Sequence, residues 1–345
     1  MALLGLDVPI VLGPFGGMSS IELTAAVSDA GGLGSYGLYG YSAERIADTA
    51  RQLRAVSDRP FALNLWMPTG DEAEPGDVDL SPALRAVAPL YEELGIEAPT
   101  GTPGRFLPTI EEQLDAVLAA RPAVLSCVFG MPPASVVAEA QARGIRVVGA
   151  ATTPAEAVAV AEAGADAVVA SGFEAGGHRV SFLKPAERSL VGTFALVPQI
   201  VDAVDIPVIA AGGIADRRGV TAAFALGASG IQVGTAFLRT RQSAASAAHR
   251  AALARLAADD TVLTRAVTGR LARGIRNRLI EQVESAGAIA PFPAQSWVVG
   301  ALRAEANRRG DGDLQSLWAG QAAALTRSDD AAEVFAELAA GLPTR

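Results

Sequence analysis

Residues 164–179, GADAVVASGFEAGGHR, hold the side chains best suited to chemistry in this chain. A short apolar run is followed by a glycine pair, Gly176 and Gly177, and then by His178, one of two histidines. Histidine takes and releases a proton near neutral pH, and glycines let the backbone approach a ligand closely. Glu174 adds an acid to the same loop. We predict that His178 is catalytic; the alternative is a histidine that only stabilises its loop.

Two further loops combine glycines with small residues, at Gly212-Gly213 and at Gly234-Thr235. Each follows a short apolar run that is typical of a buried parallel strand. Backbone N–H groups in such loops suit a phosphate, and small side chains permit its close approach. We predict a phosphate site here, with tight turns that bind nothing as the alternative.

The elements that must position these residues alternate between short apolar runs and Ala/Leu-rich helical patterns. Eight strands in this order, over roughly 240 residues, predict a (β/α)8 barrel, in which ligands bind at the C-terminal ends of the strands. A doubly wound sheet stays open, although GPFGGM after the first strand lacks the dinucleotide-binding glycine spacing. The strands are expected at 9–12, 34–37, 61–66, 124–129, 146–151, 167–170, 207–211 and 230–233.

Two segments lie outside the alternation. Residues 68–108, rich in Pro, Gly and acids, interrupt it after the third strand and predict an insertion at one face of the barrel. We place the barrel at residues 1–240 and a mainly helical segment at 241–345, which is expected to pack with the insertion over the active-site face. The basic cluster at 268–278 is predicted to join this segment to the barrel, and His249 is predicted to lie at the surface.

Composition excludes several classes of function. The net charge is −9 and Lys184 is the only lysine, so no basic surface for nucleic acid is expected. A single cysteine, Cys127, excludes an intrachain disulfide and is expected to be a small buried apolar residue. The N-terminal stretch lacks a basic region, and no segment approaches the ~20 apolar residues of a membrane span. We expect a soluble, cytoplasmic protein.

Taken together, these motifs resemble the nitronate monooxygenases, formerly called 2-nitropropane dioxygenases. The resemblance covers nearly the whole chain and depends most on SGFEAGGHR and IQVGT. It implies a (β/α)8 barrel that holds FMN without a covalent bond, oxidises alkyl nitronates with O2 to a carbonyl compound and nitrite, and needs no metal and no nicotinamide. The matching segments are PIVLGPFGGM, ALNLW, SGFEAGGHR, PVIAAGGIAD, IQVGTAFL and GRLARGIRNR.

The resemblance also implies roles for individual residues. His178 would be the general base or would orient the nitronate, whose negative charge requires positive potential from His178, Arg179 or backbone amides. Many relatives have glutamine where Ser171 stands, and some have a histidine in the run matching 126–130, where this chain has none. The residues expected to contact FMN are Met18, Asn64, Ser171, Gly176, Gly177, Gly212, Gly213, Gln232, Val233, Gly234 and Thr235.

Other functions stay open at this point. An FMN-dependent, NADH-linked reductase of the enoyl-acyl carrier protein reductase type shares the EAGGH motif and the barrel. A barrel lyase or isomerase that binds a phosphate without flavin is a second alternative, and a non-catalytic flavin-binding protein is a third. The oligomeric state is also open, with a homodimer as one option.

Overall fold

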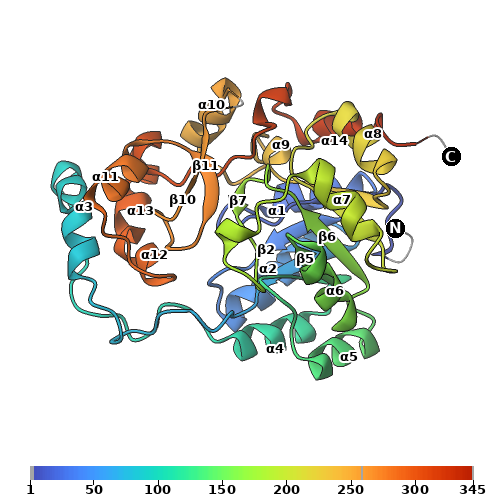
Figure 1. The fold of residues 1–345 in the computed structure, drawn as a ribbon, viewed down its shortest axis with the longest axis horizontal. Coiled ribbons are helices and arrows are strands. Elements are labelled where there is room, and N and C mark those ends of the chain that lie inside the picture. Colours follow the sequence, from blue (N-terminus) through green and yellow to red (C-terminus); the bar gives the residue numbers. More distant parts are fainter. Residues whose placement is uncertain (1–3, 258, 344–345) are drawn as a thin grey trace.

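Eight parallel strands form the centre of the protein, and helices surround them (Figure 1). The computed structural model describes residues 4–257 and 259–343. All eight predicted strands are present, with end points that differ by a residue or two at most. They are β1 (Ile10–Leu12), β2 (Gly34–Gly37), β3 (Phe61–Trp66), β4 (Val124–Val128), β5 (Arg146–Ala151), β6 (Ala167–Ser171), β8 (Val208–Ala211) and β9 (Gly230–Val233).

The order of the strands closes the sheet on itself. Hydrogen-bonded neighbours run β1-β9-β8-β6-β5-β4-β3-β2, and a parallel bridge between Val11 and Leu33 joins the two ends. A closed parallel sheet of eight strands, each followed by helical structure, is the (β/α)8 barrel that the alternation predicts. Its outer helices are α1 (Ile21–Asp29), α2 (Ala43–Val56), α4 (Ile110–Ala120), α5 (Ala134–Ala142), α6 (Pro154–Glu162), α7 (Thr193–Val201) and α8 (Arg217–Ala225), and the four-residue α9 (Thr235–Leu238) follows β9.

Local signals in the sequence explain where several outer helices begin. The Ser42 hydroxyl accepts a hydrogen bond from the third N–H of α2, and Thr153 caps α6 in the same way, with Pro154 next to it. Such caps satisfy N–H groups that have no partner within the helix, and proline at the first position has no N–H to satisfy. The helices therefore start where the sequence predicts.

Along the barrel strands, side chains alternate between the barrel interior and the layer of helices. On β6, Val169 belongs to the interior cluster, whereas Val168 and Ala170 pack with the helices. Because side chains of a strand change face at every residue, Ser171 shares the inner face with Val169 and stands at the end of the strand. The same alternation brings the other polar residues of the strand ends to one place.

The insertion and much of the C-terminal segment pack together in a second lobe, which we call the cap and which lies on the left in Figure 1. One hydrophobic cluster joins Leu90 and Tyr91 of the insertion to Ile280 and Leu302 of the C-terminal segment. The Tyr91 hydroxyl also donates to the Val298 carbonyl at 2.8 Å. The helices of the cap are α3 (Ser81–Leu94), α11 (Arg278–Ala286), α12 (Ala294–Val298) and α13 (Gly300–Arg309).

A small antiparallel sheet in the cap was not foreseen from the sequence. Strands β10 (Thr261–Thr264) and β11 (Ala272–Ile275) pair with each other, and β11 also pairs with β7 (Gly177–His178) from the loop after β6. The expectation of helices and connecting loops was therefore incomplete. These strands are only two to four residues long, and β11 pairs with β7 across about 95 positions of the sequence, so no local period reveals the sheet.

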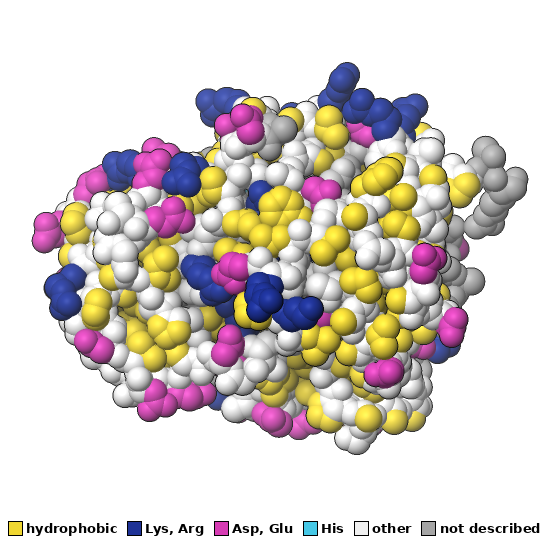
Figure 2. Space-filling view, viewed as in Figure 1, with side chains coloured by type: hydrophobic (Ala, Val, Ile, Leu, Met, Phe, Trp, Pro, Cys, Tyr) yellow, Lys and Arg dark blue, Asp and Glu magenta, His cyan; other side chains and the backbone are white. Residues whose placement is uncertain are grey.

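The basic cluster joins the C-terminal segment to the barrel, as predicted, and also to the insertion. The Arg273 Nε donates to the Phe173 carbonyl in the loop after β6 at 3.1 Å, and Arg270 forms ion pairs with Asp71 and Glu72 of the insertion, both at 2.6 Å. Acidic and basic side chains intermix on the face of the molecule shown in Figure 2.

The end of the chain returns to the barrel. Helix α10 (Ala247–Arg255) leads into the cap sheet, whereas α14 (Ala331–Ala339) packs against α1 and α8 on the outside of the barrel and not over the active-site face. No helix among the described residues has both the length and the apolar character needed to cross a bilayer.

Candidate active site

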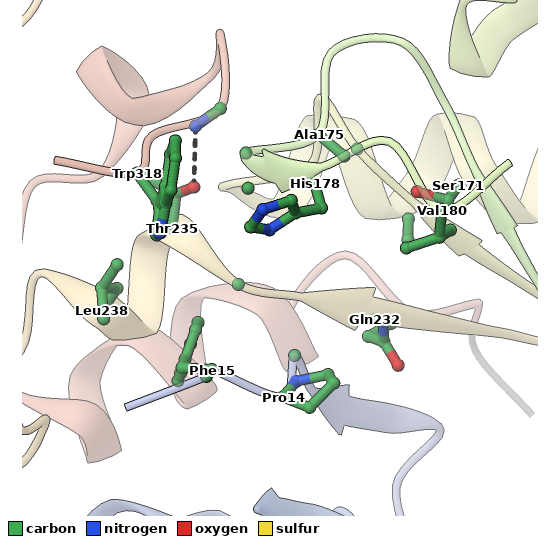
Figure 3. A pocket seen from close by; sticks show the side chains of 18 of the residues that line it. Pro14, Phe15, Ser171, Ala175, His178, Val180, Gln232, Thr235, Leu238 and Trp318 are labelled. Carbon is green, nitrogen blue, oxygen red and sulfur yellow. Dashed lines mark hydrogen bonds between the residues drawn. The ribbon is translucent and has the colours of Figure 1, made fainter. Parts of the chain in front are cut away.

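A cavity lies where the C-terminal ends of the barrel strands meet the cap (Figure 3). Its walls include inward-facing residues of the strand ends: Asn64 on β3, Ser171 on β6 and Gln232 on β9. The Asn64 amide donates to the carbonyl and the hydroxyl of Ser126, at 3.2 and 2.9 Å, and these bonds orient its side chain. The barrel thus presents several polar groups to one enclosed space.

Glycine loops form another part of the wall. Gly212 and Gly213, after β8, both have positive φ values, +97° and +72°, which side chains other than glycine rarely adopt. Gly234 and Thr235 follow β9, and the Thr235 hydroxyl accepts a hydrogen bond from the Gly320 N–H at 2.9 Å (Figure 3). This bond ties the loop after β9 to the segment that leads out of the cap.

The loop after β6 leaves room for a ligand next to its glycines. Gly177 has a φ of +75°, and a Cβ placed there would meet no protein atom within 4 Å, whereas a Cβ on Gly176 would lie 2.6 Å from the backbone of Ala319 and Gly320. The first glycine therefore keeps the loop packed against the cap, and the second keeps it open to the cavity. Glu174 does not face His178, because its carboxylate accepts from the N–H and the hydroxyl of Thr193.

His178 is positioned by the cap sheet. It pairs in antiparallel register with Ala272 of β11, and its Nε2 lies 2.9 Å from the Thr268 hydroxyl. The rings of Trp66 and Trp318 contact the imidazole edge-on, with centroid distances of 4.7 and 5.2 Å. The ring is thus held on three sides while one part of it faces the cavity (Figure 3).

This environment keeps the imidazole uncharged. Burial lowers the pKa of His178 from 6.5 to about 3, and the guanidinium groups of Arg270 and Arg303 act in the same direction. The His178 side chain is half-buried, and its exposed part lines the cavity. At neutral pH, His178 is therefore a neutral hydrogen-bonding group that is able to accept a proton.

The second histidine is not a surface residue, so that prediction was wrong. His249 is 2% exposed, and its Nε2 donates to the Trp318 carbonyl at 2.9 Å. Burial lowers its pKa to about 4. The Ala-rich helix around His249 has no clear apolar face in its sequence, and the segment that carries Trp318 decides which of its sides is buried. His249 thus supports a tryptophan that contacts His178.

The source of positive potential also differs from the prediction. Arg179 is 1% exposed and donates to the backbone carbonyls of Ser171, Gly172 and Ser189, so it stabilises the loop and does not line the cavity. Arg303 of α13 lines the cavity instead. Its Nη2 donates to the Ser316 hydroxyl at 2.7 Å, and no carboxylate among the described residues forms an ion pair with it.

The structure brings all but one of the sequence-predicted site residues to this cavity. Val233 is the exception, because its 1% exposed side chain points into the packed core between sheet and helices. Tyr39, Trp66 and Trp318 also line the cavity and were missed, since nothing in their local sequence marks them. The predicted residues at the cavity are Met18, Asn64, Ser171, Gly176, Gly177, His178, Gly212, Gly213, Gln232, Gly234 and Thr235.

A closed barrel with glycine loops after its last two strands, and a cavity holding a histidine under a cap, is an arrangement typical of (β/α)8-barrel enzymes. The family model described as nitronate monooxygenase matches residues 1–341. The chain therefore belongs to the nitronate monooxygenase family, whose members are flavin-dependent oxidoreductases.

Individual relatives agree with this family. The chain is 43% identical to a nitronate monooxygenase from Pseudomonas aeruginosa over 341 residues, which cover 97% of this chain and 96% of the relative. Among solved structures, it is similar to a nitroalkane oxidase from Streptomyces ansochromogenes, with 35% identity, a TM-score of 0.86, and coverage of 99% and 97%. It is also similar to FabK from Thermotoga maritima, with 27% identity, a TM-score of 0.76, and coverage of 98% and 93%.

Proposed function

We propose that this protein oxidises alkyl nitronates with molecular oxygen, with FMN as cofactor, and releases a carbonyl compound and nitrite. One observation supports this most: His178, Arg303 and the glycine loops after β8 and β9 all face a single cavity. An uncharged imidazole beside an arginine with no carboxylate partner suits an anionic substrate, although the chain as a whole carries a net charge of −9.

The described residues fit FMN. Gly212-Gly213 and Gly234-Thr235 would hold the phosphate, because all four residues line the cavity and none has a large side chain that would keep an anion from their N–H groups. When bound, the flavin would accept electrons from the nitronate and pass them to oxygen. The polar side chains at the strand ends and the thioether of the first loop would contact its ring system; these residues are Met18, Asn64, Ser171 and Gln232.

The remaining chemistry would fall to this chain's own side chains. His178 would orient the substrate and accept a proton at the ring nitrogen that faces the cavity, while Thr268 holds Nε2. Because its pKa is about 3 and not 6.5, accepting a proton is less favourable by about 5 kcal/mol than for an ordinary histidine. A nitronate that has already lost its carbon-bound proton is therefore the better substrate, and a neutral nitroalkane the poorer one.

The cap would exclude water from the reaction. We propose that residues 68–108, together with the cap part of the C-terminal segment, act as a lid on the barrel of residues 1–240. The ion pairs of Arg270 with Asp71 and Glu72 hold the two parts of this lid together, so that they would move as one unit, and the Arg273 Nε bonds to the Phe173 carbonyl on the barrel. Limited proteolysis of the holoenzyme should show cleavage within 68–108 that decreases when a substrate analogue is bound.

Two measurements on the purified protein test the proposed function. Its visible spectrum should be that of an oxidised flavin, and the flavin released by heat should co-migrate with FMN on chromatography. Adding propyl-2-nitronate without oxygen should bleach the flavin, and air should restore it with release of nitrite. A protein that binds no FMN, or a flavin that bleaches rapidly with NADH but not with nitronate, would contradict the proposal. The homodimer stays a prediction, which the mass in solution checks.

A further inference from the structure

Three unpartnered polar atoms belong to residues that line the cavity. Among the described residues, six buried side-chain nitrogen or oxygen atoms have no hydrogen-bond partner, and three of them belong to residues that line this one space. These are the Tyr39 hydroxyl, the Ser296 hydroxyl and the Arg303 Nε. Buried polar atoms normally have partners, and leaving one unpaired costs about 1–3 kcal/mol, so three in one cavity indicate a missing ligand.

The three groups come from separate elements that pack around the same point. Tyr39 follows β2, and its ring packs on Trp66 at a centroid distance of 4.4 Å; Ser296 lies on α12 and Arg303 on α13. Burial raises the pKa of Tyr39 to about 12, and the Ser296 hydroxyl and the charges of Arg270 and Arg303 act in the opposite direction. The groups are thus close enough to influence one another, while the two hydroxyls lie outside hydrogen-bond geometry.

The chemistry of this set selects a small anion. Arg303 offers an N–H that donates only, and each hydroxyl is able to donate as well. The planar edge of a guanidinium group donates two parallel hydrogen bonds. It therefore binds two oxygen atoms on one central atom better than the point charge of an ammonium group does. Arg303 is the one cationic side chain among the described residues that line this cavity, whereas the nearby Arg270 is paired with Asp71 and Glu72.

We propose that Tyr39, Ser296 and Arg303 form an oxyanion clamp that receives the paired oxygens of a nitronate and, equally, nitrite or nitrate. The assignment of nitronate rests on the proposed function, whereas the binding of small planar oxyanions does not. The clamp includes two residues of the cap, so it forms only when the cap lies against the barrel. It favours the anionic nitronate over the neutral nitroalkane through charge, independently of His178.

Nitrate is the probe of choice, because it is planar, anionic and inert. Calorimetric titration of the FMN-loaded enzyme should show nitrate binding in the native protein. Arg303→Met should raise the Kd for nitrate by about 10- to 100-fold, as expected for lost charge-assisted hydrogen bonds. Arg303→Lys keeps the positive charge but loses the paired N–H donors of the guanidinium group, so its Kd for nitrate should be intermediate. Arg308→Met is the matched control, since Arg308 lies on the same helix with its side chain 71% exposed and paired with Glu305; it should leave nitrate binding unchanged.

Single-atom variants keep the test independent of folding. Tyr39→Phe and Ser296→Ala should each raise the Kd for nitrate by about 3- to 10-fold. Without nitrate, their melting temperatures should equal or exceed that of the native protein, because neither hydroxyl has a partner to lose and an unpaired buried hydroxyl is itself destabilising. The KM for nitronate should rise in parallel with the Kd for nitrate, with a smaller change in kcat.

The outcomes separate the clamp from the proposed function. The clamp is refuted if the native enzyme binds no nitrate, if Arg308→Met weakens binding as much as Arg303→Met, or if the variants lose FMN in step with nitrate. In the last case the flavin itself occupies the three groups. If nitrate binding follows the predicted order but no nitronate is oxidised, the clamp stands and the proposed function fails. If nitronate is oxidised but the variants do not weaken nitrate binding in the predicted order, the proposed function stands and the clamp fails.

Discussion

Lowering the pH from 8 to 5 should leave His178 uncharged and the oxidation of a preformed nitronate nearly unchanged. Burial, together with the charges of Arg270 and Arg303, lowers the pKa of His178 from 6.5 to about 3. At pH 5, a group with that pKa is about 1% protonated, whereas a histidine with the ordinary value would be about 97% protonated. This difference corresponds to about 5 kcal/mol between the two protonation states.

Nitrogen NMR of the holoenzyme labelled with ¹⁵N-histidine measures this pKa directly. The chain has only two histidines, so a His249→Gln variant assigns both sets of signals. Both imidazoles should show neutral shifts at pH 8 and at pH 5. In parallel, the rate of flavin reduction by nitronate without oxygen should be constant over this range, with the nitronate mixed in from an alkaline stock so that it stays anionic during the measurement.

A titration of His178 with a midpoint near pH 6.5 would refute the reasoning. It would mean that water in the cavity solvates the imidazolium enough to cancel the effect of burial and of the two arginines. A rate that falls with the same midpoint in the native enzyme, but stays constant in His178→Asn with FMN bound, would show that protonation of this residue inhibits the reaction.

Four other outcomes follow from the same contacts. His178→Asn should reduce any activity on a neutral nitroalkane by about 10²- to 10⁴-fold but affect a preformed nitronate much less; equal losses with FMN still bound would show that His178 is not a base. Thr268→Val removes the hydroxyl that lies 2.9 Å from the His178 Nε2, so it should change the His178 tautomer seen by ¹⁵N NMR and should lower kcat by a larger factor than it changes KM. Thr268→Ser keeps the hydroxyl and should retain the native tautomer and kcat. An unchanged tautomer in Thr268→Val would contradict this positioning role. Gly176→Ala should destabilise the protein by about 1–3 kcal/mol and weaken FMN binding, because the new Cβ would lie 2.6 Å from the backbone of the cap, and equal urea midpoints would refute this. Since the folded pKa of His249 is about 4 and its unfolded value about 6.5, the unfolded chain binds the extra proton in this window, and His249 alone should lower the stability by up to about 3 kcal/mol as the pH drops from 6.5 to 4. His178 acts in the same direction, so the check is the difference in urea unfolding at both pH values between the native protein and His249→Gln, in which the fall should be smaller by about this amount.

Much of the barrel was predictable because its signals are local. Short apolar runs mark buried parallel strands, and a hydroxyl before a helical pattern, as at Ser42, marks where a helix begins. The glycine loops and His178 were also recognisable, because a glycine pair after a strand has few purposes other than a tight turn or a ligand. The side chains of Gln232 and Val233 alternate along β9, so only one of the two is able to face the cavity, and a contact of Val233 with FMN through its backbone stays a prediction.

The tertiary structure decided which of these groups meet and in which charge state. His178 owes its position to β11 and its low pKa to burial beside Arg270 and Arg303, residues roughly 90 and 125 positions away in the sequence. Arg179, its immediate neighbour, is instead directed to backbone carbonyls of its own loop. A pKa and a hydrogen-bond partner depend on the solvent and the charges around a group, and these are set by segments that come together only when the cap packs on the barrel. His178 was therefore recognisable from the sequence as the candidate catalytic residue, whereas its neutral state and the arginine that lines the same cavity followed from the fold alone.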